Sequence, residues 1–249
     1  MKNSSLRSVL LLLCAASLVA LGRAAGSPAK LPPPWQHQDI GSGRVGQEVP
    51  PVPVEKFGKN ALFGKGAQIA GTAKYADGVF TLQGTMDIWG PMDGAQVVWQ
   101  KVQGDVVVVA RVTSMDNPGK NAHAKAGLCI RESLDGASRA VTQCITPVDG
   151  SQFLYRAAKA DKTERIRPDP AAPKPSVPKE KFPCWLKLVR SGNVFTGYES
   201  LDGETWWHTG TITLDLKTDA LLCLTTSSHT TGTLTTAVFD HVTVTKAAK

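Results

Sequence analysis

Short segments rich in Val, Thr, Phe and Trp alternate with Gly, Asp and Asn turns through most of the 249-residue chain. Within them, apolar and polar residues often alternate with the period of two that places successive side chains on opposite faces of a strand. Eleven segments predict strands at residues 78–82, 95–100, 106–112, 126–131, 139–146, 152–156, 184–190, 193–200, 205–213, 220–227 and 234–245. Helical periodicity is nearly absent, which predicts an all-β sandwich of about eleven or more strands.

The segment 184–190 shows this alternation most clearly. Two sets of side chains are expected on its opposite faces: Trp185, Lys187 and Val189 on one, and Cys184, Leu186, Leu188 and Arg190 on the other. Ser191-Gly192-Asn193 then predicts a turn and a hairpin with the next segment. Trp99 and Trp185 both alternate within apolar strands, which favours core packing for each of them.

The first 25 residues are typical of a secretory signal peptide rather than of a folded domain. Lys2 and Arg7 precede a 14-residue apolar run at 8–21, and small residues follow it. Such a run is too short to span a bilayer comfortably, so we expect cleavage after Ala24 or Ala25 and a secreted protein with no membrane span. The alternative of lipidation at Cys14 is disfavoured because Leu13 stands where a small residue is needed.

The formal net charge of +7 comes mainly from one segment. Removing the signal peptide leaves a net charge of about +4. Residues 156–190 contain ten Lys/Arg and four Asp/Glu, so their local net charge of +6 exceeds that of the whole remaining chain. This segment is rich in Pro and nearly free of aromatic residues, whereas nucleic-acid binding needs a basic face with interleaved aromatics. It predicts a solvated loop, and no nucleic-acid partner.

One domain is the simplest organisation of the remaining chain. Residues 26–33 predict a linker, and residues 34–249 predict a single sandwich, since all-β domains reach this size routinely. Pro/Gly-rich stretches near 45–66 and 157–181 are expected to be loop insertions. No repeat of fixed period is present, and the sequence does not predict an oligomeric state.

The stretch AKAGLCIRES at 124–133 raises the question of a reactive thiol. If Gly136-Ala137 forms a two-residue turn, glycine first favours type II′. The register then places Leu128 opposite Ile145, Ile130 opposite Gln143 and Cys129 opposite Cys144. Directly opposed Cβ atoms lie about 4.5–5.5 Å apart, close to disulfide range. Leu128 and Ile130 are expected in the core, with Cys129 and Arg131 on the other face.

The four cysteines beyond the signal all lie in predicted strands: Cys129, Cys144, Cys184 and Cys223. Their spacing matches no zinc site, so no metal is predicted. An even count in an exported chain favours disulfides, with Cys129–Cys144 ahead of Cys184–Cys223. The alternative is that all four are small buried hydrophobic residues. A cysteine on a strand without a nearby base is a poor nucleophile.

Several short motifs in a shared order carry a resemblance to a known family. They include Pro34 to Gly41, Asp87-Ile88-Trp89-Gly90, Lys125 to Glu132, Trp185 to Arg190, and Ser200 with Asp202-Gly203 and Trp206. Together they resemble concanavalin-A-like (laminin-G-like) sandwich modules related to the yeast regulation-of-enolase protein and to the C-terminal domains of some β-xylosidases. The resemblance covers residues 34–245 and implies a jelly-roll sandwich of two antiparallel sheets. In bacteria, such modules often belong to exported, cell-surface or carbohydrate-processing proteins. The chain departs from the pattern at His123, where a tryptophan is common.

Catalytic patterns are weak. Retaining glycosidases need two carboxylates about 5–5.5 Å apart, and no Glu-x-Asp-x-x-Glu-like ladder places such a pair on one strand face. Glu132 and Asp135 straddle a strand end, and Glu199 and Asp202 flank a turn. No nucleophile elbow, phosphate loop or zinc-protease motif is present. We therefore predict that the chain is not an enzyme, and a glycoside hydrolase ranks third among the functions considered.

A binding site for carbohydrate or a cell-surface component needs aromatic faces and a few fixed polar groups. The predicted patch joins Trp89, Asp87, Arg131 and Arg156, and Trp206-Trp207 places one ring on each face of its strand. The alternative is that Trp89 plugs the end of the sandwich above an Asp87–Arg131 ion pair. By analogy with laminin-G-like domains, Asp116-Asn117 or Asp87/Asp93 would supply oxygen ligands to calcium, although nothing in their spacing requires it. No other cofactor is implied. The leading prediction is an exported recognition module, and the alternative is a structural or protein-partner domain without a small ligand.

Overall fold

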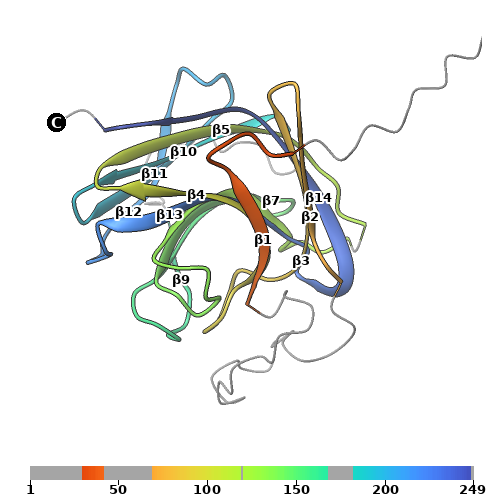
Figure 1. Ribbon diagram of the computed structural model, residues 1–249, viewed down its shortest axis with the longest axis horizontal. Coiled ribbons are helices and arrows are strands. Elements are labelled where there is room, and N and C mark those ends of the chain that lie inside the picture. Colours follow the sequence, from red (N-terminus) through yellow and green to blue (C-terminus); the bar gives the residue numbers. More distant parts are fainter. Residues whose placement is uncertain (1–29, 42–68, 119, 168–181, 248–249) are drawn as a thin grey trace, which may run out of the picture.

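Two seven-stranded antiparallel sheets form the described part of the protein (Figure 1). The computed structural model describes residues 30–41, 69–118, 120–167 and 182–247. Sheet A has the order β1 (Gln36–Gly41), β4 (Gly94–Gln103), β13 (Asp219–Ser227), β6 (Lys125–Arg131), β7 (Ala140–Thr146), β8 (Gly150–Arg156) and β9 (Glu164–Ile166). Sheet B has the order β12 (Trp207–Thr213), β11 (Val194–Ser200), β10 (Cys184–Ser191), β5 (Val106–Met115), β14 (Thr230–Thr245), β3 (Val79–Met86) and β2 (Thr72–Ala76).

The all-β sandwich is confirmed, and each of the eleven predicted strands is present. The predicted hairpin around Gly192 is also confirmed, as β10 pairs with β11. Three strands were not predicted: β1, β2 and β9. They carry weak signals because β1 is mostly polar, β2 lies on a sheet edge, and β9 has only three residues inside the predicted insertion at 157–181. The predicted signal peptide and the insertion at 45–66 lie outside the described residues.

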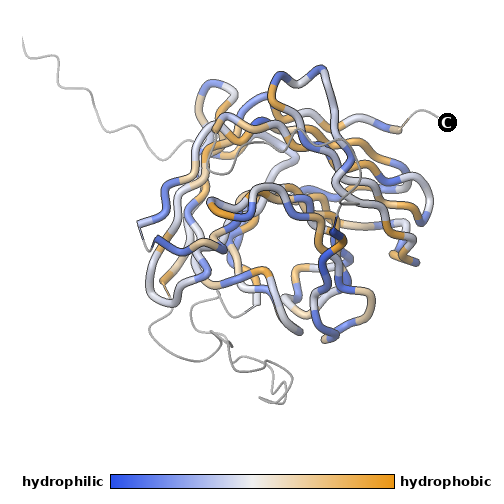
Figure 2. Tube along the Cα trace, turned by 180° about the vertical axis from the view of Figure 1, so that it is seen from behind, coloured by the Kyte–Doolittle hydropathy of each residue, from blue (hydrophilic) through white to orange (hydrophobic). Residues whose placement is uncertain are grey.

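The main core lies between the sheets, where the inward side chains of both sheets meet. Leu82, Val108, Leu186 and Phe239 of sheet B pack there, and sheet A contributes a set that includes the predicted inward residues, Leu128 and Ile130. Hydrophobic and hydrophilic positions follow one another along the strands, as Figure 2 shows. This alternation places one face of each strand in the core.

A second apolar cluster lies on the outer face of sheet A. Cys129, Cys144 and Cys223 belong to it, together with Ile88 from the loop between β3 and β4. That loop is tied to the β6–β7 loop by a hydrogen bond from the Asp93 amide to the Gly136 carbonyl (2.9 Å). Every residue of β6 and β7 is consequently buried. Sheet A is therefore covered on both faces at its centre, which the sandwich prediction did not include.

The predicted register of the β6–β7 hairpin is wrong by two residues. Cys129 lies opposite Thr142, and Cys144 lies opposite Gly127. The amide of Glu132 donates to the carbonyl of Arg139, so the turn centres on Asp135–Gly136 instead of Gly136–Ala137. Moving the centre by one residue moves the pairing by two, which changes the partners but keeps each side chain on its predicted face.

All four described cysteines are free and buried, so neither predicted disulfide is present. Cys184 lies in the main core while Cys223 lies on the outer face of sheet A, so the sheet separates that pair. Burial raises the pKa of the Cys144 thiol to about 12, and it also raises the pKa values of Cys129 and Cys223. The structure favours the alternative, in which the thiols are small buried hydrophobic residues.

The predicted core packing is found in part for Trp99 and is wrong for Trp185. Trp99 is partly buried against the second apolar cluster, on the outer face of sheet A. Trp185 lies on the outer face of sheet B, where the Arg111 guanidinium stacks 5.5 Å from its ring centroid. Both rings occupy the outward positions that strict alternation assigns to them. The alternation along the strand, and not the size of the apolar ring, therefore decides on which face of the sheet each side chain lies.

Candidate functional site

Asp87, a predicted ligand-binding residue, is buried in an ion-pair cluster. Its carboxylate lies 2.6 Å from the Lys125 ammonium and 2.8 Å from Nδ1 of His229. Burial by itself would raise the pKa of Asp87, but Lys125 and His229 together lower it below its usual value. The carboxylate is therefore already paired within the protein and is not open to a ligand.

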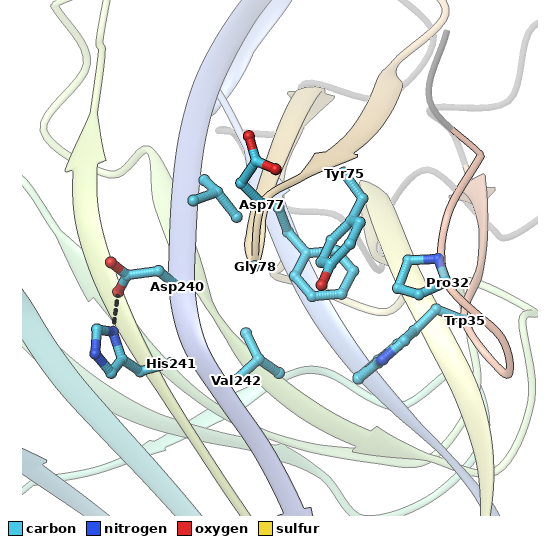
Figure 3. Close-up of a pocket in the computed structure, with 10 residues that line it drawn as sticks. Pro32, Trp35, Tyr75, Asp77, Gly78, Asp240, His241 and Val242 are labelled. Atoms are coloured by element: carbon cyan, nitrogen blue, oxygen red, sulfur yellow. Dashed lines mark ion pairs between the residues drawn. The ribbon is translucent and has the colours of Figure 1, made fainter.

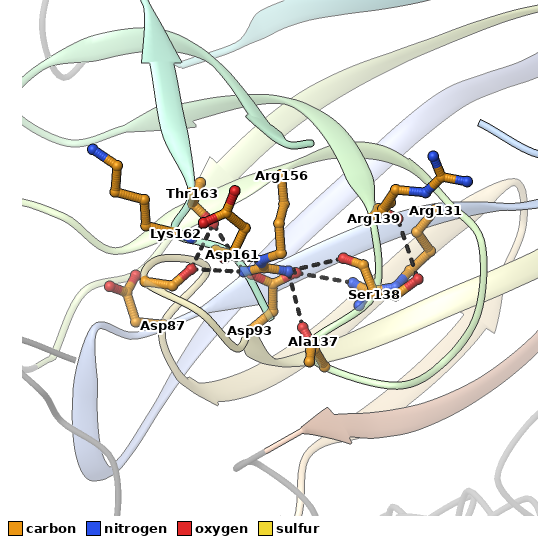
Figure 4. A network of polar contacts seen from close by, with 12 residues as sticks. Asp87, Asp93, Arg131, Ala137, Ser138, Arg139, Arg156, Asp161, Lys162 and Thr163 are labelled. Atoms are coloured by element: carbon orange, nitrogen blue, oxygen red, sulfur yellow. Dashed lines mark hydrogen bonds and ion pairs between the residues drawn. The ribbon is translucent and has the colours of Figure 1, made fainter. Parts of the chain in front are cut away.

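Arg131 and Arg156 share one buried carboxylate, that of Asp93 (Figure 4). Nη1 of Arg131 lies 3.2 Å from it, while Nη1 and Nη2 of Arg156 lie 3.1 Å and 2.5 Å away. The two guanidiniums also donate to a set of loop carbonyls: Ser133, Asp135, Gly136, Ser138, Asp161 and Gly90. This network fixes the loops that cover the outer face of sheet A.

The predicted patch is therefore not assembled as a surface. Three of its four members are buried, and only Trp89 is exposed, at 42% of its surface. The alternative prediction is also wrong in two respects, because Arg131 pairs with Asp93 rather than Asp87, and Trp89 does not plug the sandwich. The sequence alone did not indicate that Asp87 would be neutralised by Lys125 and the two arginines by Asp93 below the surface.

The oxygen ligands suggested for calcium are occupied by other partners. Asp93 binds two arginines and Asp87 binds Lys125, while the Asp116 carboxylate accepts the Thr236 amide. Asn117 is engaged with the backbone of Asn121. Within the described ranges, no group of three or more His, Cys, Asp or Glu side chains is placed to hold a metal ion.

Trp206 and Trp207, predicted to place one ring on each face of their strand, are both half-buried. The Lys187 ammonium lies 4.0 Å from the centroid of the Trp206 ring. Glu132, one of the carboxylates considered for a hydrolase, is bound to Arg139 and to the Lys217 amide. Burial would raise the pKa of Glu132, but these contacts lower it. This carboxylate is held ionised, which does not suit a general acid.

A groove of about 440 Å³ opens at one end of the sandwich (Figure 3). We call it the Trp35 groove. Three parts of the chain build it: the segment before β1, the β2–β3 turn and the irregular middle of β14. Its lining residues are Pro32, Trp35, Tyr75, Asp77, Gly78, Val79, Phe80, Asp240, His241 and Val242.

Aromatic packing holds the apolar wall of the Trp35 groove in place. Phe80 belongs to the main core, and its ring lies 5.5 Å from that of Trp35 and 4.7 Å from that of Tyr75. Tyr75 lies directly opposite Phe80 in the β2–β3 ladder. Both outer rings are only partly buried, so each presents apolar surface to the groove while its other side rests on the core.

The polar wall comes from two points where the backbone leaves regular strand geometry. Asp77 occupies the β2–β3 turn at φ 50°, and His241 lies in an irregularity of β14 at φ 49°. Positive φ values are uncommon for residues other than glycine, and here they turn both side chains out of the regular pleat. Asp77 and His241 are exposed at the groove.

Asp240 is the anchored carboxylate of the Trp35 groove. Arg111 binds it through two hydrogen bonds of 2.8 Å and 2.6 Å, and Nδ1 of His241 lies 3.0 Å from the same carboxylate. The hydrogen bond from Arg111 is the main reason that the pKa of Asp240 is lowered. An ionised and firmly held carboxylate can accept hydrogen bonds from a ligand, but it is not a proton donor near neutral pH.

The Trp35 groove thus combines two aromatic surfaces with hydrogen-bonding groups at fixed positions. Sequence analysis missed Tyr75, Asp77, Asp240 and His241, which are far apart in the chain and belong to no motif. Nothing in the sequence indicated that β14 would bring His241 beside the β2–β3 turn. A second hollow of about 480 Å³ near Lys101, Glu132 and Leu221 has no aromatic side chain in its lining.

The two packed antiparallel sheets place the chain in a broad structural class, the β-sandwich proteins. A functionally unknown protein from Saccharomyces cerevisiae matches with a TM-score of 0.54 and 13% identity, over 72% of this chain and 93% of that chain. Lectin I-B4 from Griffonia simplicifolia (metal-free form) matches with a TM-score of 0.45 and 10% identity, over 70% and 91%. A xylan β-1,4-xylosidase from Bacillus halodurans matches with a TM-score of 0.47 and 14% identity, over 68% and 34%.

The likeness to the Saccharomyces cerevisiae protein shows a shared fold and nothing about ligands, because the identity is very low. No protein-family model matches the chain, and no curated protein matches it. The two antiparallel sheets that the family resemblance implied are confirmed, while the relation to the regulation-of-enolase family stays a prediction. Over the part of the chain that the structure describes, no helix is long and apolar enough to cross a membrane.

Proposed function

We propose that the chain is an exported, non-catalytic recognition module that binds carbohydrate in the Trp35 groove. The observation that carries the proposal is the pairing of the Trp35 and Tyr75 rings with Asp77, Asp240 and His241 around one open space. Sugars present apolar C–H faces and rings of hydroxyl groups. Binding sites for small molecules combine apolar surface with a few placed polar groups in the same way.

Export is supported by the basic and apolar character of residues 1–25. N-terminal sequencing of the secreted protein is expected to begin at Ala25 or Gly26. Recovery of a soluble mature protein that still begins at Met1 would contradict export through this signal.

Binding can be tested on a panel of immobilised glycans with a variant that keeps the fold. The double variant Asp77→Asn with His241→Asn removes one charge and one ring. Both positions have positive φ, which asparagine tolerates better than most residues. We expect this variant to bind at least about tenfold more weakly than the natural protein, the loss expected for one or two charge-assisted hydrogen bonds.

Trp89→Ala is the matched control because Trp89 is exposed and outside the groove. It should leave glycan binding unchanged. Binding that is lost in Trp89→Ala but kept in the double variant would move the site to the β3–β4 loop and refute the groove assignment. If no glycan on a broad panel binds and a protein partner is recovered instead, the structural or protein-partner alternative replaces the proposal.

The non-catalytic part of the proposal has a separate test. The pure protein is incubated with each bound polysaccharide, and new reducing ends are measured. We expect none, because Asp240 at the groove and Glu132 outside it are both held ionised by arginine partners, which does not suit either carboxylate as a general acid. Hydrolysis that disappears in Glu132→Gln would overturn this part.

A further inference from the structure

A lysine lies between two aromatic rings on the outer face of sheet B, outside the Trp35 groove. The Lys187 ammonium is 4.0 Å from the centroid of the Trp206 ring and 4.7 Å from that of Tyr198. Lys187 lies directly opposite Tyr198 in the β10–β11 ladder, and Tyr198 lies opposite His208 in the next ladder. The three side chains form one row across β10, β11 and β12.

The position of Trp206 is fixed by the turn that precedes β12. The Asp202 carboxylate accepts the backbone amides of Glu204 and Thr205, both at 2.8 Å. Ser200 closes the same turn by accepting the Gly203 amide at 2.8 Å. The chain therefore leaves this turn in a defined direction, with the Trp206 ring beside the lysine. The arrangement is built by local hydrogen bonds and does not depend on the lysine itself.

Lys187 has no carboxylate partner among the described residues. Burial against the rings is the only cause that lowers its pKa. Arg111, a neighbouring cation on this face, is neutralised by Asp240. An ammonium has three N–H donors, and π faces stabilise its charge without accepting all of them in hydrogen bonds. The free donors and the uncompensated charge leave room for an anion.

The Lys187 row is linked to the Trp35 groove along β10. Trp185 precedes Lys187 by two residues, so both lie on the same face, roughly 7 Å apart along the strand. The Trp185 ring lies 5.1 Å from that of His241, which lines the groove. A chain of sugar units leaving the groove past His241 and Trp185 would reach Lys187 next.

We infer that Lys187, framed by Tyr198 and Trp206, binds the carboxylate of an acidic polysaccharide whose chain extends from the Trp35 groove. The inference rests on the proposed carbohydrate binding and adds the class of ligand, a uronic acid polymer. His208 stands at the end of the row, with its ring 6.0 Å from that of Tyr198 and Nε2 hydrogen-bonded to Thr211. It provides a further polar group for the same sugar unit.

The test compares polygalacturonate with its fully methyl-esterified form, which has the same backbone without the charge. The mature protein is titrated with each polymer by calorimetry. We expect about tenfold or tighter binding of the acidic form, as for one hydrogen bond to a charged group. This preference should decrease as salt rises from about 0.05 to 0.5 M, because exposed charges are screened.

Three variants separate the inference from the proposed function. Lys187→Met should abolish the preference for the acidic polymer while binding to the methyl ester is unchanged, and Lys187→Arg should keep most of it. Lys74→Met is the matched control, because Lys74 is exposed on β2, at the opposite edge of the same sheet, and its loss changes the net charge equally. Equal melting temperatures will show that the variants are folded.

A preference for the acidic polymer that survives in Lys187→Met would overturn the inference. So would equal binding of the two polymers by the natural protein, and so would binding of neither while a neutral glycan binds. In these cases the proposed function stands, because the double variant at Asp77 and His241 tests it separately.

Discussion

Replacing Asp93 by asparagine is expected to destabilise the protein by about 3–5 kcal/mol, the usual cost of breaking a buried ion pair. The side chains of Asp93, Arg131 and Arg156 are each at most 2% exposed, so solvent cannot screen the charges that the substitution leaves behind. The natural carboxylate holds both guanidiniums through three contacts of 3.2 Å or less. Asparagine keeps one acceptor oxygen but no charge, so two buried cations lose their counter-ion.

Urea unfolding followed by tryptophan fluorescence measures this loss. With a slope of about 2–3 kcal/mol per molar urea, the midpoint should fall by about 1–2 M. Glu132→Gln is the matched control, because its pair with Arg139 is partly exposed and should contribute about 1 kcal/mol or less. A loss below about 1 kcal/mol for Asp93→Asn, with an unchanged slope, would refute the view that this carboxylate neutralises two buried arginines.

Three further predictions concern packing, thiols and acid stability. In urea unfolding, Gly127→Ala should lower the free energy of unfolding by about 1–3 kcal/mol or more, since the added Cβ would lie 2.3 Å from the Gln143 carbonyl oxygen. The control is Gly104→Ala, whose added Cβ meets no other atom. It should cost only about 1 kcal/mol, because of the positive φ at this position. Equal costs would contradict the close approach of β6 and β7. The Cys144 thiol has a pKa of about 12, so only about 0.01% of it is thiolate at pH 8, against about a quarter of a free thiol with a pKa of about 8.5. It should resist maleimide at pH 8 until urea unfolds the chain, and rapid labelling of the folded protein would contradict its burial. The folded-state pKa of Asp240 is lowered by Arg111, so the stability from this pair is complete above about pH 4 and is lost as the pH falls through the lowered pKa. In Asp240→Asn, the melting temperature should fall less as the pH is lowered. An equal fall in the variant and in the natural protein would refute the linkage.

The alternation of apolar and polar residues was enough to predict eleven strands and the faces of β6 and β10. It was not enough to predict the β6–β7 register, because Gly136 fits either of two neighbouring turn centres. The choice between them is made by contacts that local sequence does not contain, notably the Arg131 and Arg156 hydrogen bonds to the loop carbonyls. Since the error was an even number of residues, the faces survived while the cysteine partners changed.

The candidate site could be predicted less well than the fold. A signal for the covered outer face of sheet A was present, because the sequences KAGLCIR and AVTQCIT have small or apolar residues at positions of both faces. Strands buried on both faces show this pattern, and it would have argued against an exposed Arg131. The Trp35 groove had no such signal, since Tyr75 and His241 are brought together only by the pairing of β14 with β3 and of β3 with β2.

The central claim, that glycan binds in the Trp35 groove, is tested most directly by NMR of the six tryptophan indole N–H groups. A glycan identified on the panel is titrated into the ¹⁵N-labelled mature protein, and the indole resonances are assigned by single Trp→Phe variants. The resonance of Trp35 is expected to shift with the glycan concentration, and that of Trp185, beside His241, should follow it. Those of Trp89 and Trp99 should stay unchanged. A saturable shift of Trp89 with no change at Trp35 would contradict the claim.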